Sequence, residues 1–137
     1  MIQGRVLNPG TASGAAFLLT EALSFWGGFD PKTGDIIDIH HPQRGANLAR
    51  RIVLIAETRG SGTSSGTIAE AIRIGTAPAG IIMIEPDVNI AIGASIAETL
   101  YGRTCPVVAV EPDEFRILSN ASGLTISAGG MITAASS

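Results

Sequence analysis

The strongest constraint on the fold is the nearly continuous apolar run at residues 51–56. A short run that is rich in β-branched side chains and lacks polar alternation predicts a strand buried on both faces, as in a parallel sheet. The segment after it, residues 58–64, is a loop of Gly, Ser and Thr. Thr67 and Glu70 then have the spacing of a capping box, and Gly75 is expected to end the helix that follows. The run therefore predicts a strand–loop–helix unit.

The same alternation continues toward the C-terminus. Further buried strands are expected at residues 80–84 and 107–110, and a last strand at 124–127. Helical spacing of apolar residues predicts helices at 90–100 and 112–118. Parallel strands need crossover connections of this kind, so the second half of the chain predicts a largely parallel sheet.

The first half of the chain predicts β structure. Strand patterns occupy residues 2–7, 15–20, 23–26 and 36–39, and a turn containing Pro and Gly before the last of them suggests a hairpin. Strands followed by strand–helix alternation favour an α/β fold. We expect a three-layer β/β/α swivelling domain with a mostly parallel central sheet, spanning residues 1–130. The small, polar residues 131–137 predict a flexible C-terminal tail.

Composition excludes several functions. With 137 residues and a net charge of −3, the chain lacks the basic surface that nucleic-acid binding requires. Its apolar runs are shorter than the ~20 residues that span a bilayer. A single cysteine, Cys105, can form no intrachain disulfide and cannot ligate an iron–sulfur cluster, which usually takes three or four thiolates. We expect a cytoplasmic protein whose Cys105 is structural.

The segment with the most chemical potential is residues 57–66, Glu-Thr-Arg-Gly-Ser-Gly-Thr-Ser-Ser-Gly. It follows a buried strand and opens a helix, the position at which open α/β sheets bind ligands. Backbone N–H groups and the helix dipole favour an anion there. Gly60 and Gly62 permit a tight turn that presents Ser61. The alternative interpretation is a loop that merely caps the helix.

Three known motifs do not account for this loop. The dinucleotide-binding pattern G-x-G-x-x-G has one residue fewer, and a Walker A loop needs a lysine that is missing here. The pattern G-x-S-x-G of α/β-hydrolases is present, but its acid and histidine should follow the serine. Both histidines, His40 and His41, precede it.

Four sequence motifs occur in a fixed order, and the resemblance that they carry covers most of the chain, from about Ile2 to Val110. They are Ser24-Phe25-Trp26-Gly27-Gly28-Phe29-Asp30-Pro31, Asp38-Ile39-His40-His41-Pro42, Arg59-Gly60-Ser61 and Gly75-Thr76-Ala77-Pro78-Ala79. Together they resemble the small subunit, or swivelling domain, of the aconitase X family. The chain departs from that pattern at Gly62, where many relatives carry a second small hydroxyl residue.

The resemblance implies a hydro-lyase that dehydrates a β-hydroxy acid. In such a family the large subunit binds an iron–sulfur cluster, and a mobile swivelling domain brings a catalytic serine to it. The resemblance places that serine at Ser61, as the base. Arg59, Gly60 and Gly62 would bind the small anionic substrate. Gly27 and Gly28 would let the backbone approach it, and the alternative for these two is a tight turn. It also implies a heteromer, active only with its large-subunit partner, which supplies the cluster.

Two substrates are open within the family: cis-3-hydroxy-L-proline and mevalonate 5-phosphate. The Arg59-Gly60-Ser61 form of the loop favours the hydroxyproline enzyme, because the other type tends to carry Lys in place of Arg59. A phosphohistidine-type swivelling carrier domain is an alternative of another class. It would need a histidine at the start of the helix expected after residue 89, and none is present there. A purely structural partner subunit is a third alternative.

Overall fold

The structure is a computed structural model that describes residues 1–58 and 64–135. Its strands are β1 (Ile2–Gln3), β2 (Arg5–Asn8), β3 (Ala12–Leu18), β4 (Ile52–Ile55), β5 (Gly80–Met83), β6 (Val107–Ala109), β7 (Gly123–Ile126) and β8 (Met131–Ala135). Its helices are α1 (Ser64–Ile74), α2 (Val88–Tyr101) and α3 (Pro112–Leu118). None of these helices has the length and apolar content that crossing a bilayer requires.

All eight strands form one sheet in the order β1-β8-β7-β3-β4-β5-β6-β2. The neighbours β3, β4, β5 and β6 are parallel, and the other four pairings are antiparallel. The expectation of a mostly parallel central sheet within three separate layers is therefore corrected to a single mixed sheet. The two halves join because β3 pairs with β7 through its first four residues and with β4 through its last three.

The sheet curls until its two ends lie close together. Only Gly4 separates β1 from β2, yet these strands lie at opposite ends of the strand order. Gly4 N donates to the carbonyl of Gly130 at 2.8 Å, and a Cβ on Gly4 would lie only 3.1 Å from the Cβ of Val108. A side chain at position 4 would therefore press against β6 where the sheet nearly closes.

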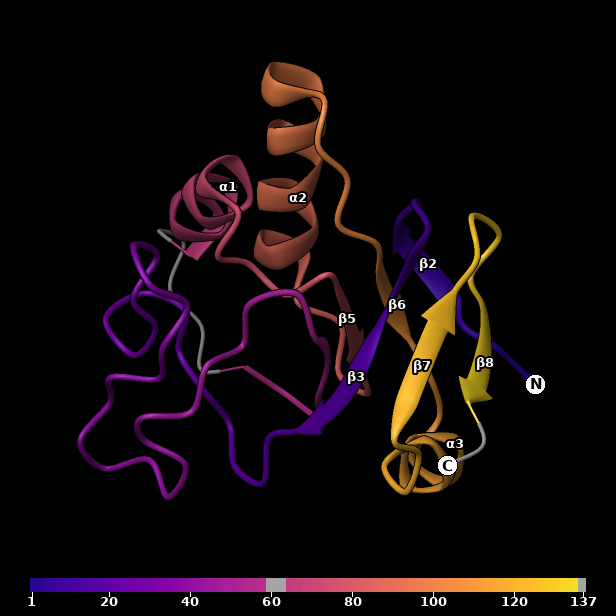
Figure 1. Ribbon diagram of the computed structural model, residues 1–137. Helices are drawn as coiled ribbons and strands as arrows, with labels where there is room; N and C mark the ends of the chain where they lie inside the picture. The colour runs from indigo at the N-terminus through magenta and orange to yellow at the C-terminus, as the bar shows by residue number, and fades with distance from the viewer. Residues whose placement is uncertain (59–63, 136–137) are drawn as a thin grey trace.

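The parallel strands are buried on both faces, as their composition predicts. In β4, Val53 and Ile55 pack toward one core, and Ile52 and Leu54 pack toward the other. The first core lies under α1 and α2, and the second lies with β7, β8 and α3 (Figure 1). Burying one such Ile or Leu contributes roughly 1.5–3 kcal/mol, so β4 is central to both cores.

The helices agree with the sequence pattern except at the start of α1. That helix begins at Ser64, so the capping box expected at Thr67 is wrong, and Glu70 pairs instead with Arg73. Helix α2 is capped by Asp87 and ends at Gly102, whose φ of 66° is left-handed. The two helices pack closely because Gly93 lacks a side chain, since a Cβ there would lie 2.5 Å from the carbonyl oxygen of Ser65.

Three expected features of the chain differ in the structure. Residues 23–26 and 36–39 are not strands, and they make only isolated bridges such as Phe29 with Ile36. The tail expected at 131–137 is β8 over its first five residues, where Ile132 is fully buried in the second core. β8 is hard to recognise from its own residues, because Thr133, Ala134 and Ala135 are small and its partner β1 lies at the other end of the chain, although β7 directly precedes it.

Candidate active site

The carboxyl ends of β3, β4 and β5 meet at one edge of the sheet, which we call the carboxyl edge (residues 19–22, 56–58 and 84–88). Parallel neighbours run in the same direction, so the loops that follow them converge there. Two cavities of about 500 and 530 Å³ open at this edge and share Glu57, Thr58 and Glu85. Cavities of this size are in the range of small-molecule sites.

A hydrogen bond ties two of the converging loops together. The hydroxyl of Thr58 donates to one carboxylate oxygen of Asp87, and the other oxygen accepts from Asn89 N at 2.9 Å. Asp87 is also the N-cap of α2, so a single carboxylate holds both the helix start and the segment after β4. Thr58 forms a parallel bridge with Leu23, which attaches the third loop.

The described residues make this edge acidic. Every ionisable side chain lining the two cavities within residues 1–58 and 64–135 is a carboxylate: Glu21, Glu57, Glu85 and Asp87. The three glutamates are exposed to solvent. Helices α1 and α2 both begin at the same edge, where the positive ends of their dipoles favour negative charge. The arrangement can hold a cationic group such as an ammonium beside an anion-binding helix start.

Four of the predicted site residues, Arg59, Gly60, Ser61 and Gly62, lie outside the described residues. The described chain stops at Thr58 on one side of them and resumes at the buried Ser64, the first residue of α1. Both of these flanking residues belong to the carboxyl edge or to the helix that starts there. The roles predicted for the four residues stay predictions.

The other two predicted residues, Gly27 and Gly28, form a turn close to this edge. Gly28 N donates to the carbonyl of Ser24 at 3.2 Å, and a Cβ on Gly28 would lie 2.6 Å from that oxygen. Gly27 has a φ of 86° and open space beside it. The turn itself thus requires both glycines, and neither lines the two cavities at the carboxyl edge. Substrate binding by these glycines stays a prediction.

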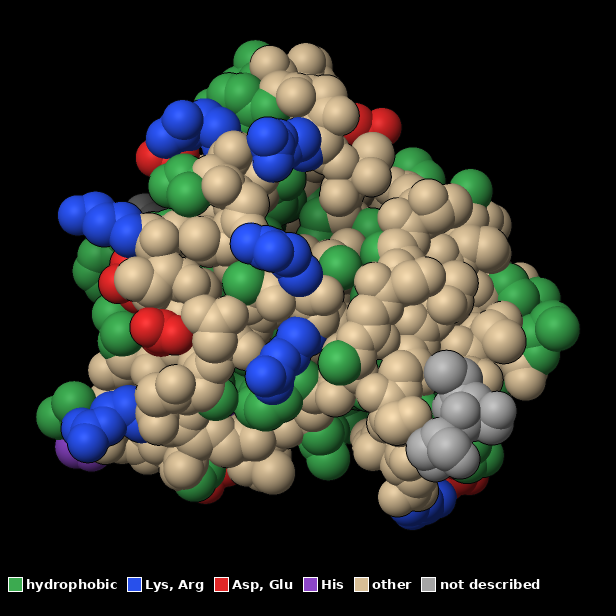
Figure 2. All heavy atoms as spheres, viewed as in Figure 1, with side chains coloured by type: hydrophobic (Ala, Val, Ile, Leu, Met, Phe, Trp, Pro, Cys, Tyr) green, Lys and Arg blue, Asp and Glu red, His purple; other side chains and the backbone are tan. Residues whose placement is uncertain are grey.

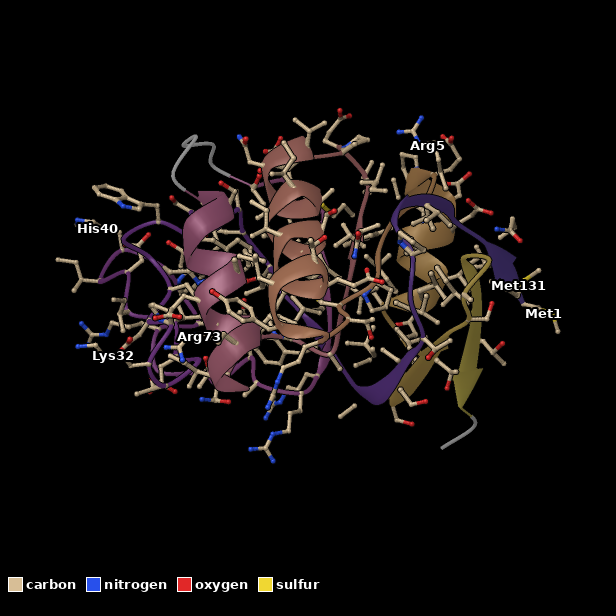
Figure 3. All side chains as sticks on the ribbon, turned by 90° about the horizontal axis from the view of Figure 1, so that it is seen from above. Met1, Arg5, Lys32, His40, Arg73 and Met131 are labelled. Carbon is tan, nitrogen blue, oxygen red and sulfur yellow. The ribbon has the colours of Figure 1, made fainter. Side chains whose placement is uncertain are left out.

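His41 holds the first loop of the carboxyl edge in place. The side chain is 6% exposed, its Nδ1 accepts from Gln43 N at 3.1 Å, and its Nε2 lies 3.2 Å from the carbonyl oxygen of Glu21. The bond at Nδ1 leaves the proton on Nε2, which donates to Glu21 O. Gln43 adds a bond from its side chain to Leu18 O and accepts from Thr20 N. His40, in contrast, is exposed (Figure 3).

Residues for an iron–sulfur cluster are missing from the part of the chain that the structure describes. Cys105, the chain's single cysteine, is buried, and its thiol donates to the carbonyl of Pro78 at 3.4 Å. Burial raises the pKa of the Cys105 thiol to about 12, so the thiolate needed for metal binding is disfavoured. Within residues 1–58 and 64–135 no three His, Cys, Asp or Glu side chains gather into a metal site. A cluster does not fit these residues.

Sequence reasoning missed the acidic residues of the edge. A signal for Asp87 exists, because Asp-Val-Asn directly before an apolar helical run is typical of an N-cap. No pattern in the sequence could pair Asp87 with Thr58, 29 residues away. The convergence of Glu21, Glu57 and Glu85 likewise depends on the parallel order of β3, β4 and β5.

Comparisons with known proteins agree with this geometry. The family profile described as the aconitase X swivel domain matches residues 1–134. The chain is 44% identical over 110 residues to a cis-3-hydroxy-L-proline dehydratase of Pseudomonas aeruginosa, which covers 80% of this chain and 19% of that protein. It is 40% identical over 93 residues to the phosphomevalonate dehydratase small subunit of Methanothermobacter thermautotrophicus, covering 68% of this chain and 71% of that one.

A solved structure agrees in fold. The crystal structure of holo-form aconitase X from Thermococcus kodakaraensis superposes with a TM-score of 0.81 at 27% identity. The match covers 98% of this chain and 97% of that one. The chain spans about a fifth of the length of the Pseudomonas dehydratase that it matches, and most of the length of the methanogen small subunit.

Proposed function

Because this chain belongs to the aconitase X swivel domain family, we propose that it is the small, serine-bearing subunit of a hydro-lyase that dehydrates cis-3-hydroxy-L-proline to a pyrroline-2-carboxylate. The observation that carries the proposal is the 44% identity to a cis-3-hydroxy-L-proline dehydratase over 80% of the chain. The placement of the candidate loop supports it, since that loop leaves the carboxyl end of a fully buried parallel strand.

In this proposal Ser61 is the base. Loss of water from a β-hydroxy acid breaks a C–H bond at the α-carbon: the Ser61 alkoxide takes that proton, and the C–H electron pair forms the Cα=Cβ double bond as the β-hydroxyl leaves as hydroxide. A Lewis acid on the partner chain would take up that hydroxide. A serine hydroxyl is a poor base unless its alkoxide is stabilised. The start of α1, three residues further along the chain, offers N–H donors and a positive dipole end. Arg59 offers a cation that stabilises the alkoxide or clamps the substrate carboxylate.

The acidic edge favours hydroxyproline over the alternative substrate. cis-3-Hydroxy-L-proline carries a ring ammonium at neutral pH, which the carboxylates of Glu21, Glu57 and Glu85 can attract. Mevalonate 5-phosphate carries a phosphate and a carboxylate, which the same side chains repel. Because some relatives are phosphomevalonate dehydratase small subunits, mevalonate 5-phosphate must be tested as a second substrate.

The remaining subunit is proposed to be a large chain that holds the iron–sulfur cluster. The methanogen relative is named a small subunit, and the Pseudomonas relative is about five times the matched length. The buried Cys105 and the absence of a metal-ligating group among residues 1–58 and 64–135 support placing the cluster on that partner. We further propose a cytoplasmic location, since reducing compartments suit a protein with a free thiol.

Co-expression with a candidate large dehydratase chain from the same organism tests the proposal. The purified complex should contain iron and convert cis-3-hydroxy-L-proline, followed by ¹H NMR, faster than it converts mevalonate 5-phosphate. Activity with neither substrate, or activity of this chain alone, would overturn the proposal. Preference for mevalonate 5-phosphate would transfer the assignment to the second substrate.

A further inference from the structure

An exposed apolar surface lies on the irregular segment between β3 and β4. Trp26 is 58% exposed, Ile37 is 46% exposed and Ile39 is 70% exposed. We call these three side chains the Trp26 patch. Single exposed apolar residues are ordinary, but a tryptophan and two isoleucines on one short segment are not, because each would gain free energy by leaving water.

The segment that carries the Trp26 patch is firmly anchored. Ile37 N donates to Gly28 O at 2.9 Å, and Asp38 N donates to the same oxygen at 3.3 Å. This oxygen therefore holds the chain at residues 37–38 against the turn that bears Trp26. The Ser24 hydroxyl also donates to Trp26 O at 2.8 Å. The backbone that carries the patch is thus already ordered, which reduces the conformational entropy that is lost when a partner binds.

Buried neighbours of the patch explain the anchoring. Phe25 and Phe29 are at most 1% exposed and their ring centroids lie 5.3 Å apart, while Ile36 is also 1% exposed. The chain therefore alternates between core and surface at Phe25 and Trp26, and again at Ile36 and Ile37. The exposed members are not needed by the core beneath them, so folding of this chain alone does not explain their apolar character.

The Trp26 patch adjoins the candidate active site. Leu23, three residues before Trp26, bridges to Thr58, the last described residue before the predicted catalytic loop. The segment 19–51 forms the end of the molecule beyond α1, opposite β7, β8 and α3 (Figures 1 and 3). A partner that reaches the carboxyl edge from this end would cover the patch as well.

We propose that the Trp26 patch is a docking surface for the large, cluster-bearing subunit of the dehydratase. The inference rests on the proposed function. The occupant is inferred from chain length. This chain corresponds to 19% of the Pseudomonas relative, so about four fifths of that protein must be packed against the part that this chain represents. It also follows from continuity, because a partner that reaches the carboxyl edge at Thr58 comes within reach of Leu23, which bridges to Thr58, and of Trp26. An exposed tryptophan beside such a site is a typical interface anchor.

The test uses the fact that Trp26 is the chain's only tryptophan. The chain is labelled with 5-fluorotryptophan, combined with the unlabelled large subunit, and observed by ¹⁹F NMR. We expect the single resonance to shift and broaden in the complex. An unchanged resonance in a complex that elutes as a heteromer would overturn the inference. A resonance that shifts with the concentration of this chain alone would assign the patch to a second copy and overturn it too.

Two matched variants locate the effect. Ile39→Ser should weaken binding of the large subunit about tenfold, measured by titration calorimetry. Ile117→Ser is the control, because Ile117 is 65% exposed on α3 at the opposite end of the molecule, and its binding should stay within about twofold of wild type. Thermal melts check that both variants fold. Equal affinities for the two variants would contradict the inference.

The proposed function can fail separately. A wild-type complex that shows the ¹⁹F shift but dehydrates neither substrate would refute the proposed function and leave the docking surface standing. An active complex with an unchanged resonance, in which Ile39→Ser binds as tightly as wild type, would refute the docking surface and leave the proposed function standing.

Discussion

The two edges of the parallel half of the sheet carry opposite charge. At the carboxyl edge the cavities are lined by Glu21, Glu57, Glu85 and Asp87. At the other end of the same strands, which we call the amino edge, a cavity of about 290 Å³ is lined by Arg50 and Arg103 and by uncharged residues. Figure 2 faces the end of the molecule where α1 terminates, and several Lys and Arg side chains lie across this face, both at the level of the helices and below them.

Helix polarity accounts for much of this difference. Arg73 lies in the last turn of α1 and Arg103 follows the end of α2, where positive charge complements the helix dipole. Asp87 caps the start of α2 for the corresponding reason. The three exposed glutamates have no such local role, since none lies within α1 or α2. Charge at each edge thus has the sign that the neighbouring helix ends favour, and the three glutamates add acidic charge at the carboxyl edge from outside the helices.

The largest contrast between the edges is expected from Ser61→Ala. If Ser61 is the base, the complex should lose dehydration activity by roughly 10²–10⁴-fold in kcat with little change in KM. Ser13→Ala is the matched control, because Ser13 is exposed on β3, is not among the residues that line the carboxyl-edge cavities, and its hydroxyl bonds to the Thr125 hydroxyl. Steady-state kinetics of both complexes decide the outcome. Full activity of Ser61→Ala would support the structural-partner alternative instead.

Cys105 lines the amino-edge cavity, and the reactivity of its thiol tests whether that cavity is closed in the native protein. Burial raises the pKa of its thiol from about 9 to about 12, so native protein at pH 8 should react with a disulfide reagent about a thousandfold more slowly than urea-unfolded protein. The unfolded chain ionises first as pH rises, so the fold should lose stability between about pH 9 and 12. Rapid labelling of native protein would show that the amino-edge cavity opens.

Gly93→Val should disrupt the packing of α1 against α2, the two helices that begin at the carboxyl edge. The added side chain would collide with the carbonyl of Ser65 and push α1 from α2. We expect a loss of about 2–3 kcal/mol in the free energy of unfolding, measured with urea. Gly66→Ala is the control: its Cβ would meet nothing within 4 Å, so this variant should be unchanged or slightly more stable.

Asp87→Ala should have a smaller effect on stability. It removes the N-cap of α2 and the bond from Thr58, at a cost of about 1 kcal/mol. Asp113→Ala is the control, since Asp113 is highly exposed and pairs only with Arg116. Urea unfolding of the two variants separates them. A loss in Asp113→Ala as large as that in Asp87→Ala would mean that the cap is not what holds this edge.

The smallest effect is expected from charge alone. Glu57→Gln combined with Glu85→Gln should raise KM for cis-3-hydroxy-L-proline a few-fold and lower it for mevalonate 5-phosphate, because exposed charges interact weakly through water. Arg103→Gln at the amino edge should change neither value. Both effects should diminish at high salt. Equal responses to the two changes would show that the charge difference between the edges has no part in substrate choice.

Prediction from sequence succeeded where a segment's own residues decide its structure. Strands β4, β5, β6 and β7 and helices α2 and α3 lie within one or two residues of their expected positions, because continuous apolar runs and helical spacing are local signals. Family membership was also legible, since four ordered motifs survive in the chain. Residues 23–26 and 36–39 were predicted wrongly as strands, because alternating apolar residues there serve an irregular, well-packed segment.

By itself the sequence determined the family, the buried parallel strands and the location of the candidate loop after β4. Tertiary structure alone decided that the sheet is mixed and nearly closed, that Met131–Ala135 completes it as β8, and that four carboxylates meet at one edge. The physical reason is range: propensity and periodicity act over a few residues. Strand order, sheet curvature and the bond from Thr58 to Asp87 join residues that only the folded chain brings together.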